Sequence, residues 1–367
     1  MSAPQPIEGP PSGPRGRDTE RNVREIDWVK GLAILGVVAI HAKVLEGSLV
    51  YSALINRSVY VFVVLFGITC ELWWQKHAGP SWLATVREWY CGRLVRLVVP
   101  VWAVLVVLWT CRVATGQLLV SWSQIAITFA GYLPWVGTGW FVTLVLQLVV
   151  LFPFIRVALN VLGPTLSVIT SLIVTVACYV HADLVIAVMR YVLLDHGEHV
   201  DLSYFYYFWI CPLPRVFSIV AGVLIARRAL RPSHYFATLA TALVCAGVIL
   251  VGPVGIGAFP AQAIMAVTDI PLTIALLASV RPLRLAPVLA TGLAWCGRHS
   301  WGLYLGQLLV HEITHLYSSP ETSSAPARCG YFLFLLIGGT ILVWVGGWLR
   351  DRAAAVRDTG ILRTQRV

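Results

Sequence analysis

Long apolar runs alternate with short polar connections along most of this chain. Ten runs are long enough to cross a bilayer as helices, since about 20 apolar residues span its hydrocarbon core. They occupy residues 28–45, 56–75, 95–111, 139–158, 163–181, 204–226, 236–252, 260–280, 293–316 and 330–349. A further run at 124–136 is too short to span and predicts a re-entrant or interfacial element. The pattern therefore predicts an all-α, polytopic membrane bundle of about ten transmembrane helices.

Basic residues gather on one side of this arrangement. With ten helices and a cytoplasmic N-terminus, 21 of the 27 Lys and Arg residues fall on the cytoplasmic side, as the positive-inside rule requires. An eleventh helix at 124–136 would move the clusters at 227–231 and 281–284 outside. We therefore predict that both termini are cytoplasmic. The domains are then a disordered basic leader at 1–23, a membrane domain at 24–349 and a basic tail at 350–367.

Composition narrows the class of protein. The chain is 58% hydrophobic and 12% charged, with a mean hydropathy of +0.78, which no soluble domain of 367 residues could bury. The net charge of +10 lies in short loops between apolar runs, which favours membrane topology over nucleic-acid binding. The eight cysteines show no CxxC spacing, so neither a zinc cluster nor a disulfide framework is indicated. We expect a multi-pass protein of the bacterial inner or plasma membrane.

The first apolar run carries three ionisable residues. Lys30 and His41 are eleven positions apart, which is about 20° beyond three helical turns and roughly 16 Å along the axis. Asp27 precedes His41 by fourteen positions, about 40° short of four turns, so all three share one sector. Ionisable residues in a membrane helix usually face the bundle interior and mark a functional site. A Lys that extends to the interface and a packing His would give the same pattern.

A second polar pattern occurs late in the chain. Residues 311–315 read His-Glu-Ile-Thr-His, the H-E-x-x-H signature of zinc proteases. His311 and His315 would share one helical face, and Glu312 would act as a base. A catalytic zinc also needs a third protein ligand, and Asp269 is the nearest, unconvincing candidate. We expect no bound metal and keep an intramembrane zinc protease as an alternative.

Five segments, in order, resemble the membrane acyltransferase family 3, which includes sugar O-acetylases and macrolide acylases. The first covers 26–41, where Lys30 takes the place of the family's Arg, eleven positions before the His. The other four are 60–67, 93–100, 139–153 and 297–305. Segment 60–67 lacks the family's Pro and Ser. Gln307 stands where the family usually has a His, and an amide can hydrogen-bond but cannot titrate.

This resemblance implies roles for particular residues. It implies His41 as the acid/base or acyl relay, Lys30 as its charged partner, and Asp27 as the residue that orients Lys30. Arg93 and Arg96 form an i, i+3 pair suited to the phosphates of the donor, although either could simply anchor the helix at the cytoplasmic face. The residues expected to line the substrate cavity are Trp140, Ser300, Tyr304 and Gln307.

The resemblance also implies the substrates. The donor would be an acyl-CoA, most often acetyl-CoA, and the acceptor a hydroxyl of a sugar, cell-envelope glycan or glycosylated metabolite. We expect no permanently bound cofactor, no nucleic-acid partner, and the lipid bilayer as the surroundings. A transporter or flippase is a second alternative. It would more often show paired halves or broken helices, and neither is evident in the sequence.

Overall fold

The computed structural model describes residues 14–48, 50–51, 54–79, 81–116, 126, 128–132, 139–192, 204–227, 243, 247, 259–317 and 324–364. These residues contain helices and no strand. In chain order the helices are α1 (Pro14–His41), η1 (Ile55–Arg57), α3 (Ser58–His77), α4 (Trp82–Ala114), α6 (Trp140–Val180), α7 (Ala182–Val192), α8 (Tyr204–Ile210), η3 (Leu213–Arg215), α9 (Val216–Arg227), α11 (Phe259–Ser279), η5 (Arg281–Leu285), α12 (Pro287–Arg298), α13 (Ser300–Tyr317) and α14 (Ala325–Thr364).

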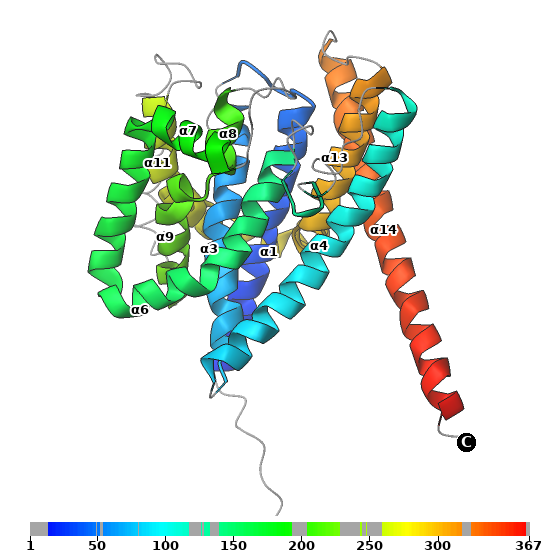
Figure 1. The fold of residues 1–367 in the computed structure, drawn as a ribbon, viewed down its shortest axis with the longest axis horizontal. Coiled ribbons are helices and arrows are strands. Elements are labelled where there is room, and N and C mark those ends of the chain that lie inside the picture. The colour runs from blue at the N-terminus through cyan, green and yellow to red at the C-terminus, as the bar shows by residue number, and fades with distance from the viewer. Residues whose placement is uncertain are drawn as a thin grey trace, which may run out of the picture.

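The helices form one bundle around α3 (Figure 1). Helices α1 and α9 pack along α3, whereas α13 packs between α4 and α14. Most of the apolar segment of α3 is buried, but little of that of α14 is. Large apolar side chains such as Val106 and Trp344 are exposed on α4 and α14. Such a surface is stable where it faces lipid rather than water.

A single glycine divides α6 into two arms. Gly163 has φ 74° and ψ 168° and precedes Pro164. This φ lies in the region that favours glycine, and proline opens a new helix readily because its nitrogen needs no partner there. The two arms correspond to the runs predicted at 139–158 and 163–181, and Figure 1 shows them turning back on each other.

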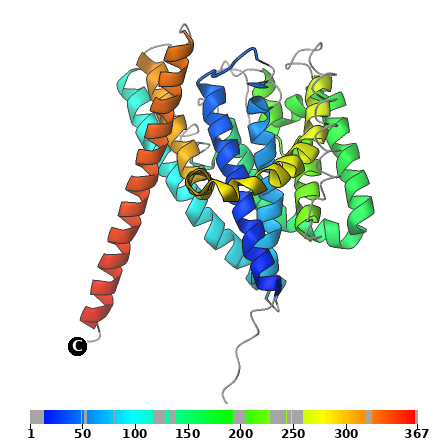
Figure 2. The same cartoon turned by 180° about the vertical axis from the view of Figure 1, so that it is seen from behind.

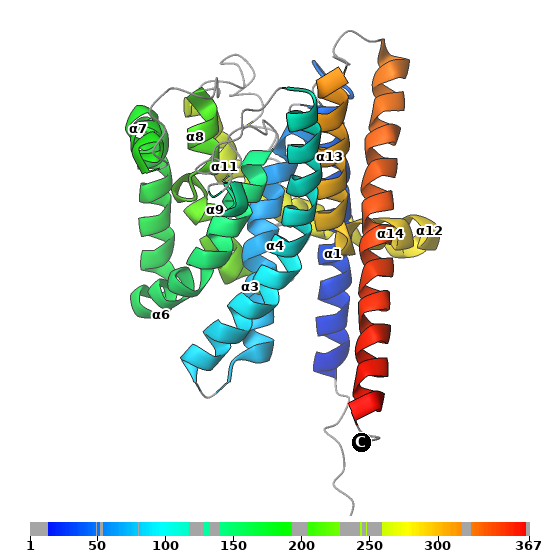
Figure 3. The same ribbon diagram turned by 45° about the vertical axis from the view of Figure 1, so that its right-hand side comes forward.

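Two glycines let α12 cross α1 closely. A Cβ added to Gly297 would lie 1.8 Å from the carbonyl oxygen of Asp27, and one on Gly31 would lie 2.2 Å from that of Leu293. Helix α12 consequently lies across α1 rather than along it (Figures 2 and 3). The predicted single span at 293–316 is therefore wrong. The helix breaks at His299, and only the part that follows, α13, runs with the bundle.

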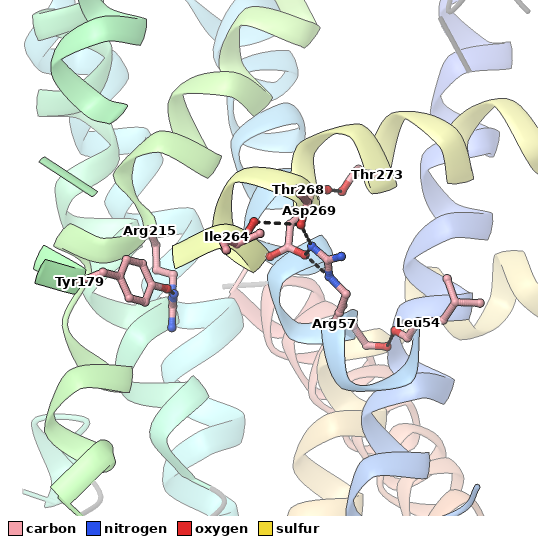
Figure 4. A network of polar contacts seen from close by, with 9 residues as sticks. Leu54, Arg57, Tyr179, Arg215, Ile264, Thr268, Asp269 and Thr273 are labelled. Atoms are coloured by element: carbon pink, nitrogen blue, oxygen red, sulfur yellow. Dashed lines mark hydrogen bonds and ion pairs between the residues drawn. The ribbon is translucent and has the colours of Figure 1, made fainter. Parts of the chain in front are cut away.

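Buried polar contacts join η1, just before α3, to α11, and join η3 to α6 (Figure 4). Nε of Arg57 donates to Oδ1 of Asp269 at 2.7 Å, and both side chains are almost fully buried. Arg57 also donates to Thr268, while Arg215 donates to the hydroxyl of Tyr179. Removing one partner of a buried ion pair typically costs about 3–5 kcal/mol, because the other charge is left uncompensated. The Arg57–Asp269 pair therefore attaches the connection between α1 and α3 to α11.

Five helical segments are long and apolar enough to span a membrane by length and composition: Ile55–His77, Trp82–Ala114, Trp140–Val180, Ala266–Leu283 and Ala325–Leu349. The protein is thus a multi-pass helical membrane protein. The predicted number of ten stays a prediction, and the run at 236–252 lies almost wholly outside the described residues. Helices α1 and α13 are not among these segments. Helix α1 contains Asp27 and Lys30, and α13 contains His311, Glu312 and His315.

The ends of the predicted membrane domain are helical. Helix α1 begins at Pro14, inside the predicted disordered leader, and α14 continues to Thr364, through most of the predicted tail. The beginning of α1 and the end of α14 lie on the same side of the bundle (Figure 3). Of the predicted interfacial run, the described residues 128–132 pack beside α4 and α6, where Trp102 donates to the carbonyl of Phe129 and Thr143 to that of Gly131.

Candidate functional site

A first cavity, of about 190 Å³, lies between α1, α3, α4, α6 and α13. We call it the lysine cavity. Its charged lining residues are Lys30 of α1 and Arg93 of α4, and Ser300 of α13 contributes a hydroxyl. The remaining lining is largely aromatic and aliphatic, including Phe66 and Tyr304. Two fixed cations in a mostly apolar wall suit an elongated ligand with an anionic end.

Arg93 is oriented by a neighbouring indole. Its guanidinium carbon lies 4.4 Å from the ring centroid of Trp89, within the range of a cation–π contact. The indole nitrogen of Trp89 in turn donates to the carbonyl of Val149 at 2.9 Å. Arg96, three residues on, is exposed and does not line the cavity. The predicted arginine pair thus divides into one cavity residue and one surface residue.

Asp27 is a neighbour of the lysine cavity but not part of its lining. It is half-buried and lies within electrostatic range of both Lys30 and Arg298. The Asp27 carboxylate therefore interacts electrostatically with two cationic side chains, Lys30 in the cavity and Arg298 on α12.

The aromatic wall comes from Phe141 rather than from the predicted Trp140. The Phe141 ring packs edge-on against Tyr304, with centroids 5.3 Å apart, and both residues line the lysine cavity. Trp140 instead packs against Trp209, at 5.6 Å between centroids, and is not among the cavity residues. Successive helix positions differ by about 100° in direction, so neighbours at the start of α6 face different surroundings.

A second cavity, of about 200 Å³, lies where α1 ends beside α13 and α14. We call it the histidine cavity. Its polar lining residues are His41, Lys43, His311, His315, Arg328 and Tyr331. The rings of His41 and His311 have centroids 5.1 Å apart, and those of His311 and His315 are 4.3 Å apart. The structure therefore places His41 in a different cavity from Lys30, on the same helix.

Of the H-E-x-x-H residues, the two histidines line this cavity and Glu312 does not. Nδ1 of His311 lies 2.9 Å from the hydroxyl oxygen of Tyr331, at hydrogen-bond distance. Glu312 faces the other side of α13, where Arg112 donates to its carboxylate at 2.8 Å. In the part of the chain that the structure describes, no three His, Cys, Asp or Glu residues are arranged to hold a metal ion. Glu312 is thus engaged by an arginine, while the two histidines join His41.

Gln307 lies on α13 between residues of the two cavities. Ser300 and Tyr304 precede it in the lysine cavity, and His311 follows in the histidine cavity. Its side chain is fully buried, and neither amide atom has a hydrogen-bond partner. The spacings of four, three and four positions keep these residues on one side of the helix. The helix therefore carries a polar stripe from one cavity to the other.

Comparison with protein families gives a match over nearly the whole membrane domain. The family model of the acyltransferase domain of acyltransferase family 3 matches residues 23–348. The chain belongs to acyltransferase family 3. Because of this family match, the protein is an acyltransferase enzyme. Neither the curated proteins nor the solved structures give a match.

Several residues that line the histidine cavity of this family 3 acyltransferase could not be found from local sequence patterns. Tyr331 and Arg328 belong to α14, and Lys43 lies in the turn after α1. The local signal for His311 and His315 was the H-E-x-x-H pattern, which indicated a zinc site. The structure places His311 beside His41, on a helix 270 positions earlier in the chain.

Proposed function

We propose that this enzyme transfers an acyl group, in the first instance acetyl, from acyl-CoA to a hydroxyl of a sugar, cell-envelope glycan or glycosylated metabolite. The observation that carries the proposal is the pair of cavities on α1 and α13. One contains fixed cations, and the other contains clustered imidazoles. The first suits a phosphate-bearing donor and the second suits proton transfer.

The donor enters at the lysine cavity in this proposal. Lys30 and Arg93 bind its phosphates, and charge-assisted hydrogen bonds make such contacts strong. The pantetheine arm, which is long and contains amides, then extends along the polar stripe past Gln307. The thioester reaches His41, roughly 16 Å from Lys30 along α1. Tyr304 and Phe141 form the aromatic wall beside this path.

The chemical step takes place in the histidine cavity. The acceptor oxygen attacks the thioester carbonyl carbon, so that a carbon–oxygen bond forms and the carbon–sulfur bond breaks. His41 accepts the hydroxyl proton and returns it to the departing thiolate, which leaves as the free thiol of CoA. General acid–base catalysis of this kind contributes about 10²–10⁴-fold. The products are the ester and CoA, with no redox change.

The first experiment measures release of CoA from radiolabelled acetyl-CoA by the purified protein in detergent, with and without a panel of glycosides. We expect turnover by the wild type and its loss in His41→Ala. His181→Ala is the matched control, because His181 is exposed at the end of α6 and lines neither cavity. Equal turnover by wild type and His41→Ala would contradict the role of His41.

Zinc content is measured on the same samples to test the protease alternative. Stoichiometric zinc that is lost in His311→Ala, without any acetyl-CoA turnover, would replace the acyltransferase assignment of this site by a metal site. The Arg112–Glu312 ion pair favours the acyltransferase, because a metalloprotease needs that glutamate beside its metal-bound water.

A further inference from the structure

The histidine cavity carries more positive charge than acyl transfer to a neutral sugar requires. Lys43 and Arg328 line it beside the imidazoles, and no carboxylate of the described residues lines it. The imidazoles alone can exchange the proton of a hydroxyl. The two permanent cations therefore indicate a second task, which is binding.

Lys43 is held at the cavity in a rare backbone conformation. Its φ is 53°, just after α1 ends at His41, and Leu45 follows with φ 60°. Side-chain-bearing residues adopt this left-handed region uncommonly. Arg328 Nη1 donates to the carbonyl oxygen of Lys43 at 3.2 Å, so α14 clamps this turn. Strained residues cluster at ligand sites, where the surrounding structure holds them.

The acidic residue near Arg328 stays at the rim. Oε2 of Glu46 lies 3.8 Å from Nη1 of Arg328, and the two side chains are 44% and 34% exposed. Exposed ion pairs of this length contribute little, and Glu46 is not among the lining residues. The described lining residues of the cavity thus include two cationic side chains and no carboxylate, a composition that favours an anionic ligand.

The size of the cavity restricts what can enter. At about 200 Å³ it is smaller than the roughly 300–1,000 Å³ of sites for drug-sized ligands. Only a small part of an acceptor fits, such as one sugar ring with its substituent. The charge and the reacting hydroxyl must therefore lie close together on the ligand.

We infer that the acceptor carries an anionic oxygen group, phosphate or carboxylate, close to the hydroxyl that is acylated, and that Lys43 and Arg328 bind this group. The inference rests on the proposed function, since it names the class of acceptor for the same site. It makes Lys43 and Arg328 selectivity residues, and it leaves proton transfer to His41.

The test is protection of the cavity histidines from diethyl pyrocarbonate, which acylates imidazole. The full-length protein in phosphatidylcholine nanodiscs is treated alone or with glucose, glucose 6-phosphate, glucuronate or inorganic phosphate. Mass spectrometry follows the modification rates of His311 and His315, with the exposed His181 as the internal reference. A parallel series uses nanodiscs that contain phosphatidylglycerol, which separates a lipid headgroup from a soluble anion.

We expect glucose 6-phosphate and glucuronate to protect at concentrations at least about tenfold lower than glucose or inorganic phosphate. Lys43→Gln and Arg328→Gln should each raise the protecting concentration about tenfold, as loss of a charge-assisted hydrogen bond predicts. Arg190→Gln, a variant of an exposed arginine of α7 outside both cavities, should change nothing. Equal protection by glucose would overturn the anionic requirement. Equal protection by phosphate, or protection by phosphatidylglycerol alone, would overturn the assignment to an acceptor.

Acceptor kinetics separate this inference from the proposed function. If wild-type protein turns over acetyl-CoA but shows no preference for anionic over neutral sugars, only the class of acceptor is wrong. If it shows no turnover with any acceptor, the proposed function itself is wrong, whatever the footprint. In an active enzyme, Lys43→Gln should bring the ratio of kcat/KM for anionic and neutral acceptors toward one.

Discussion

The lysine cavity and the histidine cavity have nearly the same volume, about 190 and 200 Å³, and helices α1 and α13 contribute to both. They differ in chemistry. The first combines two cations with aromatic walls, whereas the second combines two cations, Lys43 and Arg328, with three imidazoles and a phenol. Fixed charges bind, and imidazoles exchange protons near neutral pH. In the proposed function, proton transfer takes place in the histidine cavity alone, three turns of α1 away from the donor phosphates.

The largest expected effect is on the histidine cavity. His41→Ala should lower kcat for acyl transfer by about 10²–10⁴-fold, the usual contribution of a general base. The KM for acetyl-CoA should change little, because the proposed function places the donor phosphates in the other cavity. Steady-state kinetics with a saturating acceptor measure both constants. A large rise in KM with unchanged kcat would show that His41 binds the donor, and the separation of the two cavities would then be wrong.

The next largest effect is expected on the KM for acetyl-CoA, and it should differ between variants of Arg93 and Arg96. Arg93→Ala should raise the KM for acetyl-CoA by about 10- to 100-fold, since a hydrogen bond to a charged group contributes about 1.5–3 kcal/mol. Arg96→Ala is the matched control, because Arg96 lies one turn away and is exposed. We expect it to change KM less than about threefold, as an exposed charge is screened by solvent. Equal effects would mean that the donor phosphates lie outside the cavity, at the surface of α4.

A smaller effect is expected from the partner of His311. Tyr331→Phe removes the hydroxyl at 2.9 Å from Nδ1 and should lower kcat about two- to tenfold, the range for one neutral hydrogen bond. The KM for acetyl-CoA should not change. Tyr90→Phe is the control, because it also loses a hydrogen bond, to the carbonyl of Val150, but outside both cavities. A similar loss of kcat in both variants would indicate a general effect on folding.

The sequence predicts the arrangement of site residues that lie on one helix, but it does not predict which residues from distant helices come together. The shared sector of Asp27, Lys30 and His41 follows from helix geometry alone. The pairing of α1 with α13 and α14 does not, because no local pattern records which membrane helices are neighbours. Small residues such as Gly297 allow close helix contacts, but their partners appear only in the fold. The same limit explains why Trp140 was predicted for the cavity and Phe141 was found there.

The smallest effect concerns the polar stripe between the cavities. Gln307→Leu replaces a buried amide without hydrogen-bond partners by an apolar side chain of similar volume. It should stabilise the protein by about 1 kcal/mol, since a buried unsatisfied polar group is unfavourable. Thermal unfolding in detergent should then occur a few degrees higher. The kcat should nevertheless fall several-fold, because the amide would no longer bind the amides of the donor's pantetheine arm. A variant that is more stable and fully active would show that the donor does not pass Gln307, and that the two cavities are not joined along α13.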